Sequence, residues 1–281
     1  MSKIHEALQK AEQEKKQKID TPDSQQSPLL IPKEKEDIPQ IHQDSGIPVD
    51  KGNQEIAFQK NVICFNNSDI LISEQFRNLY ATLQYSFTNG NTRSSHCIGV
   101  SSPGKGEGKS TITINLGTTM ASDSNKSILI MDADLRNPSI HKLIDLQREP
   151  GLSNILSGIN SLEECIFPTI LPNLKVLPAG KPVKNPVELL GSQQFKQLVK
   201  TLKGQFHIVL IDTPPVLPVT ETKVLATQLD GMVLVVEANR TQQNTLEKSI
   251  EILNYMKAPL LGVILNKVKR ISNEYYYYYG E

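Results

Sequence analysis

The feature that most constrains the fold of this chain is a glycine-rich segment between a largely apolar run and a helical pattern. Residues 101–111 read SSPGKGEGKST, and ITINLGTTM continues the helical pattern. Glycines let backbone N–H groups turn inward around a polyphosphate, and the following helix directs its positive end at the same anion. The strict pattern G-x-x-x-x-G-K-[ST] is not met, because Pro103 stands at its first glycine. The surrounding strand, glycines, GKS and helix still favour a phosphate-binding loop.

Within this loop, Lys109 is expected to reach the β- and γ-phosphates of a nucleotide, and the Ser110 hydroxyl is expected to bind Mg²⁺. A glycine-rich turn that binds nothing is the alternative. The candidate nucleotide-contacting residues are Gly104, Lys105, Gly106, Glu107, Gly108, Lys109, Ser110 and Thr111.

Two further apolar runs end in aspartates. ILIMDADLR contains Asp132 and Asp134, and HIVLIDTPP contains Asp212, after which two prolines stop a central strand. The carboxyl ends of parallel strands share one edge, where ligands bind. One carboxylate alone could be a helix cap or a solvated strand end. Three beside a GKS loop indicate a site for a metal-bound nucleotide.

Strands that alternate with helices predict an α/β fold with three layers and a mostly parallel sheet, typical of P-loop NTPases. The expected strands are 96–101, 127–132, 174–178, 206–212, 231–236 and 260–266. The expected helices are 73–88, 109–122, 138–145, 186–203, 219–228 and 242–256.

The segments before and after this pattern differ in composition. Residues 1–18 predict a short amphipathic helix, which either frays in solvent or docks on a partner or membrane surface. The Pro-, Ser- and Gln-rich residues 19–60 predict a disordered linker. The P-loop domain is assigned to 61–270, and the remaining tail, 271–281, contains five consecutive tyrosines.

The composition excludes several classes of protein. Thirty basic and thirty acidic residues give a net charge of zero, which argues against a nucleic-acid binder. No apolar run approaches the roughly 18 residues that cross a membrane, and the N-terminus lacks a signal-peptide core, so a cytosolic protein is expected. The three cysteines are expected to be reduced and mostly buried, and the scattered histidines suggest no metal site.

The three motifs resemble the Walker A, Walker A′ and Walker B motifs of bacterial tyrosine kinases (BY-kinases), the cytoplasmic kinases of capsule and exopolysaccharide export. The resemblance covers roughly residues 70–281 and continues through GLS at 151–153, NPVELL at 185–190 and the tyrosine tail. The opening MSKIHEALQKAE further resembles the exosortase (XrtA)-associated exopolysaccharide branch.

The resemblance implies an ATP-dependent tyrosine autokinase. Lys109 and Ser110 would hold phosphate and Mg²⁺, and Asp212 would act on Mg²⁺ through water. Asp132 and Asp134 would assist the metal and the proton of the attacking tyrosine, with the base left unassigned. Arg240 and Asn266 would border the adenine, although a solvated loop end is the simpler interpretation of each.

The resemblance also implies partners. These are other copies of the chain, a membrane polysaccharide co-polymerase (a Wzz-type chain-length determinant) as activator, and a protein-tyrosine phosphatase. The co-polymerase would hold the kinase at the inner face of the cell membrane.

Two residues depart from the family pattern. Its E-x-x-R-x-x-R helix motif, used in subunit contacts, has Tyr80 at the second arginine, which makes a ring-shaped oligomer less secure. Lys105 replaces a common proline and lies one residue from the extra lysine of MinD/ParA-type ATPases.

The tail separates the two function classes that share this fold. The first is a kinase that phosphorylates the tail in trans, since a terminal segment can reach an active site. The alternative is a MinD/ParA-type switch ATPase without kinase activity. Such an ATPase is expected to end in a basic amphipathic helix, which NEYYYYYGE is not. The predicted phosphorylation sites are Tyr275, Tyr276, Tyr277, Tyr278 and Tyr279.

Overall fold

The computed structural model describes residues 62–66, 69–88 and 95–269. The predicted N-terminal helix and the linker lie outside these residues. So do all five predicted phosphorylation sites, Tyr275, Tyr276, Tyr277, Tyr278 and Tyr279, which therefore stay predictions. Among the residues described, no helix combines the length and apolar character needed to cross a membrane.

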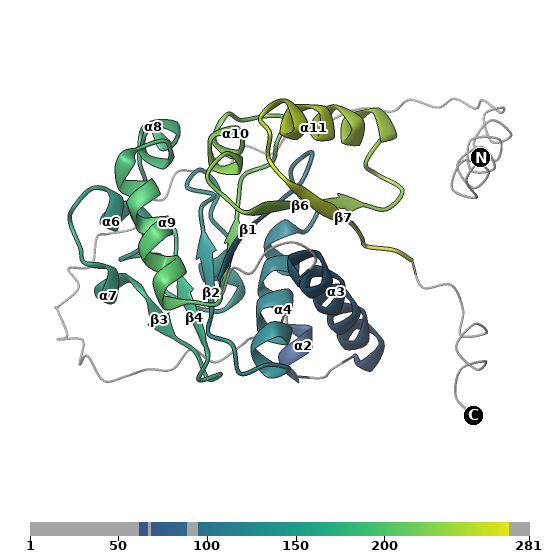
Figure 1. Ribbon diagram of the computed structural model, residues 1–281, viewed down its shortest axis with the longest axis horizontal. Coiled ribbons are helices and arrows are strands. Elements are labelled where there is room, and N and C mark those ends of the chain that lie inside the picture. The colour runs from purple at the N-terminus through teal and green to yellow at the C-terminus, as the bar shows by residue number, and fades with distance from the viewer. Residues whose placement is uncertain (1–61, 67–68, 89–94, 270–281) are drawn as a thin grey trace, which may run out of the picture. The chain divides into compact units, whose positions relative to one another are not determined.

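A seven-stranded sheet forms the middle layer, in the order β3-β4-β2-β5-β1-β6-β7 (Figure 1). All neighbouring strands pair in parallel except β3, which pairs antiparallel with β4 at one edge. Apolar residues fill the central strands because helices cover both faces of the sheet. The strands are β1 His96–Ser101, β2 Ile128–Asp132, β3 Phe167–Pro168, β4 Leu174–Leu177, β5 Ile208–Asp212, β6 Gly231–Glu237 and β7 Leu260–Asn266.

Helices cover the two faces of this sheet. On one face lie α2 Ile63–Asn66, α3 Ile70–Thr88, α4 Lys109–Ser122 and α5 Ile140–Leu143. On the other lie α6 Leu152–Leu156, α7 Leu162–Cys165, α8 Pro186–Leu190, α9 Gln193–Gln205, α10 Glu221–Ala226 and α11 Gln243–Tyr255.

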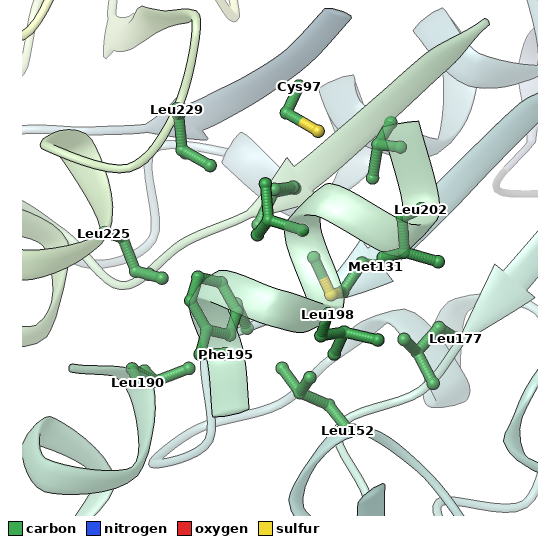
Figure 2. Packing of buried hydrophobic residues seen from close by; sticks show 14 of the residues in the cluster. Cys97, Met131, Leu152, Leu177, Leu190, Phe195, Leu198, Leu202, Leu225 and Leu229 are labelled. Atoms are coloured by element: carbon green, nitrogen blue, oxygen red, sulfur yellow. The ribbon is translucent and has the colours of Figure 1, made fainter. Parts of the chain in front are cut away.

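Each face of the sheet has its own hydrophobic core. In Figure 2, Phe195, Leu198 and Leu202 of α9 face Met131 of β2 and Leu177 of β4. The spacing of the three α9 residues places them on one side of a helix, so the sequence pattern accounts for the packing. The opposite core is built mainly from α3, α4 and the other side chains of the same strands.

All six predicted strands are present, and their bounds agree within two residues. The predicted helix 186–203 is wrong as one helix: it is α8 and α9, separated at Gly191 and Ser192. The Ser192 hydroxyl accepts the Phe195 N–H at 3.2 Å and so begins a new helix. Residues 138–145 and 219–228 are helical only over α5 and α10, and β3, α2, α6 and α7 were not predicted.

Tyr80 lies in the core rather than on the surface of α3. It shares a buried stripe with Ser73, Phe76 and Leu83, and its side chain is 5% exposed. Its hydroxyl has no hydrogen-bond partner among the described residues. Arg77, on the neighbouring face, pairs with Glu74 and Asp123. The departure from the family motif at position 80 therefore places an aromatic ring in the core, where a subunit contact cannot use it.

Candidate nucleotide-binding site

The phosphate loop leaves the carboxyl end of β1, a strand inside the sheet, and leads into α4. Gly106 and Gly108 have φ angles of 80° and 94°, in the left-handed region that side chains rarely adopt. A Cβ atom on Gly108 would lie 2.2 Å from Nδ2 of Asn266, so this position also lacks space for a side chain. The first turn of α4 thereby directs its backbone N–H groups at the loop, as an anion site requires.

Lys109 joins two of the predicted carboxylates. Its Nζ lies 2.9 Å from Oδ2 of Asp134 and 3.3 Å from Oδ1 of Asp212. The Ser110 hydroxyl donates to Oδ2 of Asp212 at 2.5 Å. Residues from three segments, expected at the shared carboxyl edge of the parallel strands, therefore lie within contact distance of one another.

Burial sets the protonation of this cluster. Burial raises the pKa of Asp212, although Lys109 and the Ser110 hydroxyl oppose the shift. Burial and then the negative charge of Asp212 raise the pKa of Asp132 to about 8. Burial alone would lower the pKa of Lys109, but Asp212 and Asp134 outweigh it and the net pKa is raised. Lys109 is therefore a fixed positive charge at neutral pH.

Asp132 has a different environment from the other two aspartates. All three aspartates are buried, and Asp132 lies opposite Asp212 in the register of β2 and β5, so its environment differs in the groups that it hydrogen-bonds. One carboxylate oxygen accepts the Asp134 N–H at 3.1 Å, and the other accepts the N–H groups of Ser139 and Ile140 at 3.0 and 3.1 Å. Asp132 thus shapes the turn that carries Asp134.

Glu107 lies beneath the loop and not on its phosphate-facing side. It is 5% exposed, and its carboxylate accepts the Gly104 N–H at 3.1 Å and the Thr241 hydroxyl at 2.5 Å. The side chain therefore ties the loop to the segment after β6.

The end of β7 holds the other flank of the loop. Asn266 donates its side-chain N–H to the Glu107 carbonyl at 2.9 Å, and Lys267 donates to the Gly106 carbonyl at 2.9 Å. Lys267 also pairs with Glu237, which pairs in turn with Arg240 at 2.8 Å. The two residues predicted to border adenine thus lie on the β6 and β7 side of the loop.

A pocket of about 420 Å³ opens on the opposite, β2 and β5 side of the loop. The predicted residues that line it are Lys105, Gly106, Gly108, Lys109, Ser110, Thr111 and Asp134. Four lining residues were not predicted: Asn137, Ser139, Leu143 and Pro215. The first three follow ILIMDADLR closely, and Pro215 belongs to IVLIDTPP, so extending both motifs by a few residues would have found them.

The remaining predicted residues support the pocket from behind or beside it: Gly104, Glu107, Asp132, Asp212, Arg240 and Asn266. Arg136 pairs with Glu221, a buried residue at the start of α10. That pair fastens the segment after β2 to the segment after β5.

The chemistry of the donors suits Mg²⁺. The Ser110 hydroxyl and the Asp212 carboxylate present hard oxygen atoms side by side. Within the described part of the chain, no three His, Cys, Asp or Glu residues are arranged to hold a metal alone. Mg²⁺ usually takes one or two protein ligands together with phosphates and water, so a hydroxyl and a carboxylate are a suitable donor set for it.

The sheet order, the loop and the three aspartates define a P-loop NTPase. A family model described as "ParA: NUBPL iron-transfer P-loop NTPase" matches residues 93–275. The fold of MinD from Pyrococcus horikoshii is also similar, with 24% identity and a TM-score of 0.55 over 63% of this chain and 72% of that one.

Comparison with individual relatives shows which family of P-loop NTPases the chain belongs to. The chain is 33% identical to tyrosine-protein kinase YwqD of Bacillus subtilis, over 81% of this chain and 94% of that protein. It is 36% identical to tyrosine-protein kinase ptk of Acinetobacter johnsonii, over 81% of this chain and 31% of that protein. The kinase domain of the Escherichia coli tyrosine kinase ETK has a TM-score of 0.71 at 26% identity, over 78% of this chain and 84% of that one. The chain belongs to the bacterial tyrosine-protein kinase family.

Proposed function

We propose that this protein is an autokinase that transfers the γ-phosphoryl group of ATP to the five tail tyrosines, Tyr275–Tyr279, of another copy of the chain. The observation that carries the proposal is the position of Lys109 between Asp134 and Asp212 at the phosphate loop. Together with family membership, it supplies the charges that phosphoryl transfer needs. The tail itself lies outside the described residues.

The transfer proceeds by in-line displacement. The phenolic oxygen forms a bond to the γ-phosphorus, the bond from that phosphorus to the β–γ bridging oxygen breaks, and ADP leaves with the electron pair. The phenolic proton passes to Asp134, because Asp134 lines the pocket and Asp132 does not. Positioning and charge stabilisation account for most of the catalysis, since phosphoryl transfer needs little covalent help from the protein.

Each part of the site has a role in this proposal. Lys109 and the loop N–H groups would hold the phosphates. Ser110 would bind Mg²⁺, Asp212 would act on it through water, and the ion would neutralise phosphate charge when bound. Asp132, whose two carboxylate oxygens both accept backbone N–H groups, would assist the metal site by holding the turn that carries Asp134. Arg240 and Asn266 border the base on the opposite side of the loop.

The family resemblance supports a role in exopolysaccharide or capsule export. The kinase would act as an oligomer at the inner face of the cell membrane, activated by a membrane polysaccharide co-polymerase and reset by a tyrosine phosphatase. Each phosphate adds about −1.5 to −2 charges at neutral pH. Several phosphates on adjacent tyrosines repel one another and loosen the oligomer, which would time polymer export.

The test is incubation of purified protein with γ-labelled ATP, with and without the cytoplasmic segment of the activating partner, followed by mapping of labelled residues. Label on Tyr275–Tyr279 is expected to disappear in Lys109→Met and in Asp132→Asn. Phosphate release with no labelled tyrosine, with the partner segment present, would instead indicate a switch ATPase and refute the proposal.

A further inference from the structure

The phosphate loop separates two sides of the site. Asn266 and Lys267 hydrogen-bond to carbonyl groups of the loop from the β7 side. The pocket opens on the other side, where the segments after β2 and β5 form its walls. A nucleotide whose base lies on the β7 side therefore leaves the β2 and β5 side for a second reactant.

The wall of that second side is partly apolar. Leu143 ends α5, and Pro215 follows the carboxyl end of β5. Neither residue has a polar side-chain group with which to bind phosphate or metal. A triphosphate and Mg²⁺ thus leave two apolar surfaces of the pocket without a ligand.

Both apolar surfaces are held in place. Leu143 is partly buried and packs against the core cluster beneath α4. Pro215 is buried between anchored neighbours: the Thr213 N–H donates to the Val100 carbonyl at 3.0 Å, and the Val216 N–H donates to the Ser102 carbonyl at 2.8 Å. Fixed apolar walls select a ligand by shape.

We propose that Leu143 and Pro215 form the subsite for the aromatic ring of the acceptor tyrosine. The inference rests on the proposed function and concerns its acceptor. A phenol fits this pocket because its apolar ring can lie against the two walls while its hydroxyl reaches the polar end, where Asp134 and Lys109 lie. Serine or threonine would leave the walls uncovered, so the pocket favours tyrosine.

The test separates acceptor binding from nucleotide binding. Trace wild-type or variant enzyme phosphorylates increasing amounts of full-length Lys109→Met protein, which carries the tail but cannot label itself and is distinguished by a size tag. The KM for this acceptor and the KM for ATP are measured separately. A second acceptor, with serine at positions 275–279, checks that tyrosine is required.

Leu146 provides the matched control. It packs against the same core cluster as Leu143 but does not line the pocket. Leu143→Ala should raise the acceptor KM about tenfold and leave the ATP KM unchanged, as expected when an apolar pocket loses part of its wall. Leu146→Ala should keep the wild-type acceptor KM. Leu143→Met should also have an acceptor KM close to that of the wild type, because methionine keeps an apolar side chain at this wall. Pro215→Ala tests the second wall independently and should also raise the acceptor KM.

An acceptor KM in Leu143→Ala and Pro215→Ala equal to that of Leu146→Ala would overturn the subsite while leaving the kinase proposal intact. Equal labelling of the serine acceptor would also overturn it. If the wild-type enzyme labels no tyrosine at all, the proposed function fails, and the subsite fails with it.

Discussion

Replacing Glu107 by alanine should loosen the phosphate loop from below. The substitution removes the acceptor of the Gly104 N–H and of the Thr241 hydroxyl. A hydrogen bond to a charged group contributes about 1.5–3 kcal/mol. Two effects reduce this loss: water can reach the partly exposed Gly104 N–H, and removal of a buried carboxylate recovers its desolvation cost. We therefore expect the free energy of unfolding to fall by about 2–3 kcal/mol.

Urea unfolding of ligand-free protein, followed by circular dichroism, measures this loss, and calorimetry measures ADP affinity. Glu107→Gln should cost less than about 1 kcal/mol, because the amide keeps an acceptor and can donate to the Thr241 oxygen. In a double-mutant cycle with Thr241→Val, the coupling energy should be about 1–2 kcal/mol. ADP affinity should fall about tenfold in Glu107→Ala. A coupling energy below about 0.3 kcal/mol, with unchanged stability of Glu107→Ala, would refute this account of the loop.

Three further predictions concern the backbone and the thiols. Gly108→Ala should abolish ADP binding in calorimetry, and adding Asn266→Ala should restore little of it, because the clash is removed but the positive φ remains. Ser192→Ala should lower the free energy of unfolding by about 1 kcal/mol in urea titrations by removing the cap of α9; an unchanged midpoint would contradict this. Burial raises the pKa of the Cys97 thiol to about 12 and that of Cys165 to about 11, so neither should react with iodoacetamide at pH 8 until the protein unfolds, as mass spectrometry can show.

The sequence predicted the sheet well because each central strand is a continuous apolar run that ends in a recognisable motif. The ends of β1, β2 and β5 carry the loop and the aspartates, so parallel order alone brought the site together. The three cysteines are free, as predicted. The short helices α6 and α7 were not predicted, because segments of five and four residues show too little hydrophobic periodicity.

The finer roles within the site depend on tertiary contacts that a linear pattern does not encode. Glu107 was predicted to contact nucleotide as part of the glycine-rich loop, but its carboxylate accepts the hydroxyl of Thr241, 134 positions away, which no local pattern shows. Asp132 and Asp134 were treated alike, and both are buried, but the turn after β2 places only Asp134 at the pocket. Tyr80 was interpreted through subunit contacts, whereas its place in the α3 stripe makes it a core residue.

The strand order also sets the distance that the tail must cover to reach the site of its own subunit. From β7, where the described chain nears its end, to β2 there are four strand spacings, or about 19 Å at roughly 4.8 Å each. Six Cα-to-Cα steps lead from Lys269 to Tyr275, and a fully extended chain of that length spans about 20 Å. A straight chain of that length only just equals the distance to β2, whereas a chain that continues to Tyr279, four residues further on, has about 13 Å more reach. Transfer between copies of the chain, as proposed above, removes this limit on reach, so labelling of the first and of the last tyrosine should both rise with protein concentration.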